Sequence, residues 1–97
     1  MDDLKFEWGA HKNSANQSRH GVFFEQAKTV FGDEHTRLIA DLEHFGSEVR
    51  FVLLGLSFDS KLLVVCRCIK ADECIRIFLA RKADKQEREI YQAYRHA

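Results

Sequence analysis

The sequence predicts one domain of the α+β class over residues 1–97, with two amino-terminal helices, an antiparallel β-meander of about four strands and a carboxyl-terminal helix. Three observations predict this class. Helical spacing dominates the first third of the chain. Strand-like apolar runs follow, and the loops between the last three are short, which favours antiparallel neighbours. A capping motif then opens a final amphipathic stretch.

The amino-terminal third predicts one short strand and two helices. Residues 4–8 alternate between apolar and polar and are typical of a strand. Residues 10–19 have a helical pattern, and Gly21 is a natural terminator beyond them. The next helix buries Phe24, Ala27 and neighbouring apolar residues and ends near Gly32. Helical spacing gives the first helix a polar, cationic face that includes Trp8, Lys12, Ala15, Asn16 and Arg19.

The remaining two thirds predict the sheet and the last helix. The strand-like runs are residues 36–40, 49–57, 62–69 and 74–81. Asp84 can cap the helix that follows, and Glu87, three residues later, completes a capping box. This helix presents one face made of Ala83, Glu87, Ile90, Tyr91 and Tyr94.

The register of the sheet decides which arginines share a face. If the last hairpin closes with an even number of loop residues, Arg67 lies opposite Arg76 and the reverse face is wholly apolar. The same argument one hairpin earlier places Arg50 on the arginine side. We therefore predict one dry face and one mixed face on which the three arginines cluster. Because like charges opposed across strands destabilise a sheet, carboxylates or a bound anion should neutralise the cluster.

Composition limits the class of protein. The net charge is zero, but residues 1–60 hold 6 Lys+Arg against 10 Asp+Glu, and residues 61–97 hold 9 against 5. This polarity suits an anionic ligand or a charged protein partner, although chance is the alternative. No apolar run approaches the roughly 20 residues of a membrane helix. The three cysteines favour a reduced compartment, so we expect a cytoplasmic protein that does not bind a membrane.

Metal and cofactor sites are not predicted. Cys66 and Cys68 lie two apart on a strand, where their sulfurs are too distant for one tetrahedral zinc ion, so we interpret them as small buried hydrophobic residues. The sequence contains no phosphate-binding glycine loop, serine nucleophile signature or dinucleotide fingerprint.

Residues spread along the chain carry a family resemblance. The first set comprises Phe6-Glu7-Trp8, Lys12, Asn16, Arg19-His20-Gly21-Val22, Phe24-Glu25 and Ala27. The second comprises His44, Glu48, Arg50, Gly55, Leu63-Val64-Val65, Ile75-Arg76-Ile77, Ala80-Arg81-Lys82-Ala83, Glu87 and Tyr91. In this order and spacing, these residues resemble the BrnT family of bacterial toxins over nearly the whole chain.

The resemblance implies a RelE-like fold and a metal-independent RNA endonuclease that halts translation without a cofactor. It also implies a BrnA-like antitoxin that holds the toxin inactive in a hetero-oligomer, with operator DNA contacted only through the antitoxin. The chain departs from the family pattern at Arg67, Ile69, Lys70 and Leu79. These departures favour an alternative, a catalytically weak toxin-like domain that acts as an antitoxin-binding transcriptional corepressor. A generic protein-interaction domain is the default if the resemblance is accidental.

Metal-free RNA cleavage requires a proton acceptor for the 2′-hydroxyl, stabilisation of the phosphate and a proton donor for the leaving oxygen. His20 is the candidate base or acid, and Arg67 and Arg76 would hold the phosphate through their planar forks. Arg81 could bind the RNA backbone, and the Tyr91 hydroxyl could donate a proton. The alternatives are a helix-terminal role for His20, ion pairs or solvation for the arginines and simple packing for Tyr91.

The remaining candidates would bind RNA. Trp8 would stack on a base, whereas its alternative is a hydrophobic lid over the sheet. Lys12 and Arg19 would line a path for the phosphates, and Arg50 would add to it; solvation is the alternative. Glu87 would complete the interface, unless it serves only as the capping-box partner of its own helix.

Overall fold

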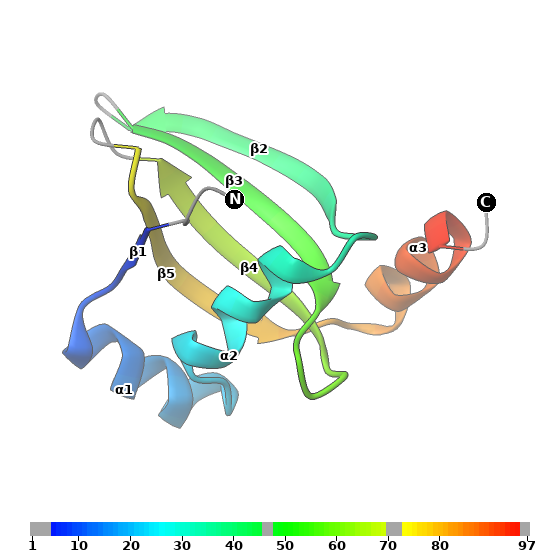
Figure 1. Cartoon of the computed structure of the whole chain (residues 1–97), viewed down its shortest axis with the longest axis horizontal. Coiled ribbons are helices and arrows are strands. Elements are labelled where there is room, and N and C mark those ends of the chain that lie inside the picture. Colours follow the sequence, from blue (N-terminus) through cyan, green and yellow to red (C-terminus); the bar gives the residue numbers. More distant parts are fainter. Residues whose placement is uncertain (1–4, 46–47, 70–72, 96–97) are drawn as a thin grey trace.

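The computed structural model describes residues 5–45, 48–69 and 73–95 (Figure 1). The elements follow one another along the chain as β1 (Phe6–Glu7), α1 (Ala10–His20), α2 (Phe24–Lys28), the 3₁₀ helix η1 (Thr29–Gly32), β2 (Arg37–Phe45), β3 (Glu48–Leu56), β4 (Leu62–Ile69), β5 (Ile75–Lys82) and α3 (Lys85–Arg95). The predicted α+β class and the predicted helices are therefore confirmed, with the second one continuing as a 3₁₀ turn. No helix in the described part of the chain is long and apolar enough to cross a membrane.

The sheet has five strands in the order β1-β5-β4-β3-β2. Strands β2 to β5 form the predicted antiparallel meander. The prediction of a purely antiparallel sheet of about four strands is wrong at one edge, where β1 pairs in parallel with β5 through Phe6↔Ile75 and Glu7↔Arg76. A two-residue strand has little pattern of its own, so its direction depends on a partner that is distant in the sequence.

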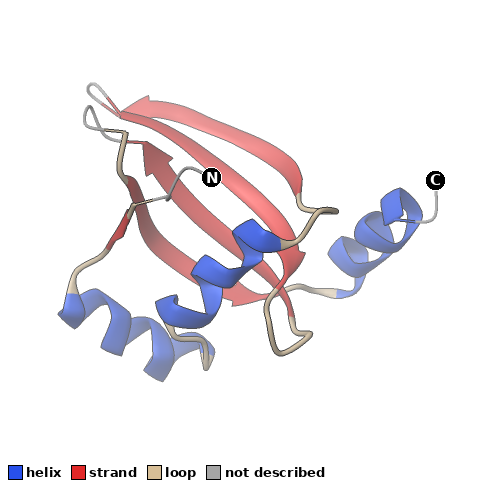
Figure 2. Ribbon diagram, viewed as in Figure 1, coloured by secondary structure: helices blue, strands red, loops and turns tan. Residues whose placement is uncertain are grey.

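Each face of the sheet carries a hydrophobic cluster. On one face, Leu63, Val65 and Ile77 pack with α2 and η1, which lie in front of the strands in Figure 2. On the other face, Val64 and Leu54 pack with Tyr91 of α3. The prediction of one dry face and one mixed face is therefore wrong. Successive residues of β4 point to opposite faces, and here both sets find a hydrophobic cluster.

The predicted register is also wrong. Arg67 pairs with Ile77, while Arg76 pairs with Cys68, so Arg67 and Arg76 point to opposite faces of the sheet. In the hairpin of β3 and β4, Leu56 pairs with Leu62, so the turn over residues 57–61 has an odd number of residues instead of an even one. Arg50 therefore lies opposite Cys68 and not on the side of Arg67. A hydrophobic pattern selects a register only when one face is buried and the other is not. Since each face carries a hydrophobic cluster here, that criterion could not reject the wrong pairing.

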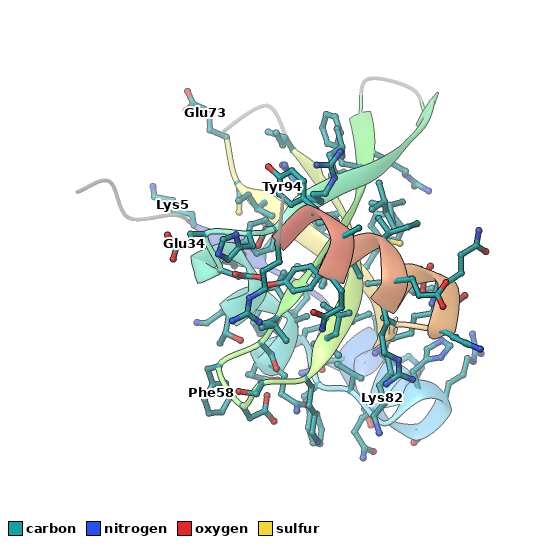
Figure 3. The ribbon with its side chains drawn as sticks, turned by 90° about the vertical axis from the view of Figure 1, so that its right-hand side faces the viewer. Lys5, Glu34, Phe58, Glu73, Lys82 and Tyr94 are labelled. Atoms are coloured by element: carbon teal, nitrogen blue, oxygen red, sulfur yellow. The ribbon has the colours of Figure 1, made fainter. Side chains whose placement is uncertain are left out.

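The start of α3 follows the prediction. The Glu87 backbone N–H donates to Asp84 Oδ1 at 2.8 Å, and the Asp84 N–H donates to Glu87 Oε1 at 2.9 Å. This is the predicted capping box, which satisfies two amide groups that the helix cannot satisfy internally. Figure 3 shows α3 lying across the strands, with Tyr94 reaching toward β2. There, the Arg37 guanidinium lies 3.8 Å from the centre of the Tyr94 ring.

Candidate functional site

Helix α1 is attached to the sheet through one buried amide side chain. Asn16 is 7% exposed, and its Nδ2 donates to the carbonyl oxygens of Val22 and Ala80, both at 2.8 Å. Its Oδ1 accepts a hydrogen bond from the Ala80 N–H at 3.2 Å. The amide thus bonds both the carbonyl oxygen and the N–H of Ala80, as a neighbouring strand would at the edge of β5. It fixes which side chains of α1 face the sheet.

A pocket of about 410 Å³ lies between α1 and three neighbouring strands. Its lining includes four lysine or arginine side chains and a histidine, and the described lining residues include no carboxylate. A concave surface of one charge sign attracts ligands of the opposite sign. The pocket brings together five of the ten predicted site residues, namely Lys12, Arg19, His20, Arg50 and Arg76; Ala15, Asn16, Cys68, Phe78 and Leu79 complete the lining.

The strand side of the pocket follows from the observed register. Arg50 pairs with Cys68, and Cys68 pairs with Arg76, so the three side chains leave the same face of three adjacent strands. The pairing skips Phe78, which lies at an irregularity between the pairs Arg67↔Ile77 and Cys66↔Leu79. Such bulges redirect side chains and often lie beside functional sites. The Arg50 guanidinium lies 4.8 Å from the Phe78 ring centre, within the range of a cation–π contact.

Glu7 orients Arg76. Arg76 Nη1 lies 2.7 Å from Glu7 Oε2, and each side chain is 33% exposed. The parallel pairing of β1 with β5 places these two residues side by side. The ion pair offsets one positive charge of the pocket and holds the guanidinium in place. Glu7 was not among the predicted site residues, because its contact with Arg76 follows from the parallel pairing of β1 with β5 and not from a local sequence motif.

Arg67 lies outside the pocket, on the opposite face of the sheet. Its guanidinium carbon lies 4.8 Å from the Phe51 ring centre and 5.7 Å from that of Phe31. Its Nε is buried and has no hydrogen-bond partner among the described residues. Burial lowers the pKa of Arg67. The predicted phosphate clamp of Arg67 with Arg76 therefore does not form, because the true register separates them.

Arg81 and Glu87 bind each other. Two parallel hydrogen bonds join Arg81 Nη1 to Glu87 Oε1 and Arg81 Nη2 to Glu87 Oε2, each at 2.8 Å. The hydrogen bond from Arg81 lowers the pKa of Glu87, and the same bond raises the pKa of Arg81. The pair connects the end of β5 to the first turn of α3. Neither side chain lines the pocket.

Tyr91 and Trp8 pack elsewhere in the molecule. Tyr91 is 1% exposed, and its hydroxyl donates to Asp33 Oδ2 at 2.6 Å. Burial, with the hydrogen bond to Asp33, raises the pKa of Tyr91 to about 12. Trp8 packs against the cluster under α2, with its ring 6.0 Å from that of Phe24. Both residues occupy the packing positions that were the alternatives to their predicted roles.

Cys66 packs in the cluster that faces α3, and burial raises the pKa of its thiol. Cys68 is buried at the wall of the pocket. Within residues 5–45, 48–69 and 73–95, no group of three or more His, Cys, Asp or Glu side chains is arranged to hold a metal ion.

Comparison with known proteins identifies a family and a similar solved structure. Residues 8–87 match the family described as "Ribonuclease toxin, BrnT, of type II toxin-antitoxin system". Among solved structures, the fold is similar to the crystal structure of the ribonuclease toxin BrnT of Brucella abortus. The TM-score is 0.61 at 15% sequence identity, and the match covers 86% of this chain and 100% of the other. No curated protein matches the sequence.

Proposed function

The chain belongs to the BrnT family of ribonuclease toxins of type II toxin–antitoxin systems, and we propose that it is a metal-independent RNA endonuclease whose centre is the pocket between α1 and strands β3 to β5. The observation that carries this proposal is the convergence of Lys12, Arg19, Arg50 and Arg76 with His20 around one concavity. RNA carries a phosphate at every nucleotide, so a cationic groove that contains a histidine suits its binding and cleavage.

The roles follow from the chemistry of each side chain. Arg50 and Arg76 hold the scissile phosphate, because guanidinium groups bind phosphate oxygens in a fixed fork geometry. The 2′-oxygen attacks phosphorus and the bond to the 5′-oxygen breaks, which leaves a 2′,3′-cyclic phosphate and a 5′-hydroxyl. His20 takes the 2′-hydroxyl proton or returns a proton to the 5′-oxygen. Lys12 and Arg19 bind neighbouring phosphates along α1.

The lining of the pocket supports a reaction without a metal ion. Magnesium is bound in proteins mainly through carboxylates, together with water and substrate oxygens. The described residues of the lining supply nitrogen donors, one thiol, apolar groups and the Asn16 amide, which is already bonded to Val22 and Ala80, in place of carboxylates. Arginine forks then stabilise the charge that develops on the phosphate, a role that a metal ion has in other nucleases.

The family also implies a protein partner. We propose a BrnA-like antitoxin that holds this chain inactive in a hetero-oligomer in the cytoplasm and contacts operator DNA on behalf of the complex. The corepressor alternative uses the same partner without the nuclease.

The first prediction tests the nuclease. Replacing His20→Ala should slow RNA cleavage by roughly 10²–10⁴-fold, because a positioned acid or base contributes about that factor. His11→Ala is the matched control, since His11 is exposed on the same helix and does not line the pocket. Cleavage of a defined RNA by the purified chain, followed on denaturing gels, should persist in EDTA. Intact RNA and normal growth with a folded chain would instead favour the corepressor.

A further inference from the structure

A second surface lies beside η1, toward the end of the sheet where β3 begins and β4 ends. Figure 1 shows that, on the face carrying α2, the described helices lie away from the start of β3 and the end of β4. The strand pairs Phe51↔Arg67, Ile69↔Ile75 and Phe6↔Ile75 place their side chains on this end. We call it the Arg67 patch and define it as Phe6, Phe31, Phe51, Arg67 and Ile69.

The patch is apolar around a single cation. Ile69 is 40% exposed, and the three phenylalanines are partly buried. The Phe6 and Phe31 rings meet edge to face with their centres 5.0 Å apart. Exposed apolar surface around an arginine is typical of protein interfaces, where aromatic residues and arginine supply most of the binding energy.

Arg67 lacks a counter-ion among the side chains that the structure describes, which are those of residues 5–39, 50–69 and 73–95. Its guanidinium lies beside the rings of Phe51 and Phe31, and no carboxylate within residues 5–39, 50–69 and 73–95 forms an ion pair with it. Partial burial of a cation without an anion is unfavourable, and ring contacts offset only part of that cost. A carboxylate arriving from outside would supply the missing charge and two parallel hydrogen bonds.

We infer that the Arg67 patch is a docking surface for the antitoxin and that it receives a carboxylate flanked by apolar side chains. A protein segment fits better than RNA, because RNA requires a row of cations and the patch offers one. The cationic row lies in the pocket on the opposite face of the sheet. This inference rests on the antitoxin named in the proposed function, but it does not depend on the nuclease.

The experiment measures binding of the purified chain to its antitoxin by calorimetry. Arg67→Ala should weaken binding roughly 30-fold, the loss typical of a central interface arginine. RNA cleavage and thermal stability should stay close to those of the unchanged chain. Arg67→Lys keeps the charge without the fork and should also weaken binding, which provides a second readout if Arg67→Ala does not fold. Arg37→Ala is the matched control, since Arg37 also lies against an aromatic ring, that of Tyr94.

The other outcomes would each overturn the inference. Unchanged antitoxin binding by folded Arg67→Ala and Arg67→Lys chains would show that the patch is not the docking surface. An equal loss in Arg37→Ala would assign the effect to net charge. Lost RNA cleavage with intact antitoxin binding would assign the patch to RNA. If the unchanged chain binds no antitoxin, the proposed partner is wrong, and so is the docking surface. If the unchanged chain binds the antitoxin and the Arg67 variants bind equally well, only the docking surface is wrong.

Discussion

At the scale of single residues, buried polar groups join parts of the chain that sequence patterns do not connect. Asp33 is an example, because its carboxylate accepts hydrogen bonds from Tyr91 Oη and from the backbone N–H groups of Leu56 and His35. Burial by itself would raise the pKa of Asp33, but these hydrogen bonds outweigh it and lower the pKa. The carboxylate thereby connects η1, β3 and α3.

A prediction at this scale concerns Tyr91→Phe. It should lower the free energy of unfolding at pH 7 by about 1 kcal/mol, since one buried hydrogen bond is lost while Asp33 keeps two others. The folded-state pKa of Tyr91 is raised to about 12 from the ordinary value of 10.0. The stabilisation by its hydroxyl is therefore fully present below pH 10 and disappears as the pH rises toward 12.

The measurement is urea unfolding of both chains at pH 7 and pH 11. Tyr94→Phe is the control, because Tyr94 lies on the same helix but is 44% exposed. The free energy of unfolding should differ less between the unchanged chain and Tyr91→Phe at pH 11 than at pH 7. An equal difference at both pH values would show that the neutral hydroxyl is not what stabilises the fold.

At the scale of elements, α1 supplies three of the five lysine, arginine and histidine side chains of the pocket and depends on Asn16 for its position. Asn16→Ala should destabilise the fold by about 3 kcal/mol, because it leaves backbone groups of Ala80 and Val22 without their partner in a buried place. It should also slow RNA cleavage at temperatures where the chain stays folded, since Lys12, Arg19 and His20 move with α1.

Thermal unfolding and RNA cleavage test this prediction together. Ser14→Ala is the control, because Ser14 is exposed on the same helix. Asn16→Asp keeps the acceptor for the Ala80 N–H and loses both donated hydrogen bonds, so it should also be destabilised. Full stability of the Asn16→Ala chain would show that α1 is held by its apolar contacts alone.

The element scale also shows what local sequence patterns can predict. Gly21 adopts a positive φ of 72° and ends α1, and Asp84 caps α3, both as the sequence indicates. These features depend on neighbouring residues. The register that separates Arg67 from Arg76 belongs to the pairing of β4 with β5, whose connection contains Glu73 at a positive φ of 64°, and Phe78 is skipped farther along the same two strands. No local pattern encodes either feature, so the candidate site was predicted only in part.

At the scale of the whole molecule, the charge polarity of the sequence does not become a polarity in space. Residues 1–60 carry the acidic excess, yet they supply Lys12, Arg19 and Arg50 to the pocket. The basic second part contributes Arg76, while its Arg81 is bound to Glu87. The fold therefore brings cationic side chains from both parts of the chain to one pocket, and a polyanion would bind to that pocket.

The salt dependence of RNA binding tests that collection as a whole. Four cationic side chains should give a slope of about −3 for log K against log salt concentration, since each phosphate neutralised on a single strand contributes roughly −0.7. Lys12→Gln should make the slope less steep by about 0.7. Lys85→Gln, an exposed change on α3, should leave it unchanged, and so should Arg67→Ala on the opposite face. The measurement is fluorescence anisotropy with a labelled RNA, over a salt range of roughly 50 to 200 mM. Methylated 2′-hydroxyls in this RNA prevent cleavage during the titration. A slope that Lys12→Gln does not alter, or that Arg67→Ala does alter, would place the RNA on a different surface from the pocket.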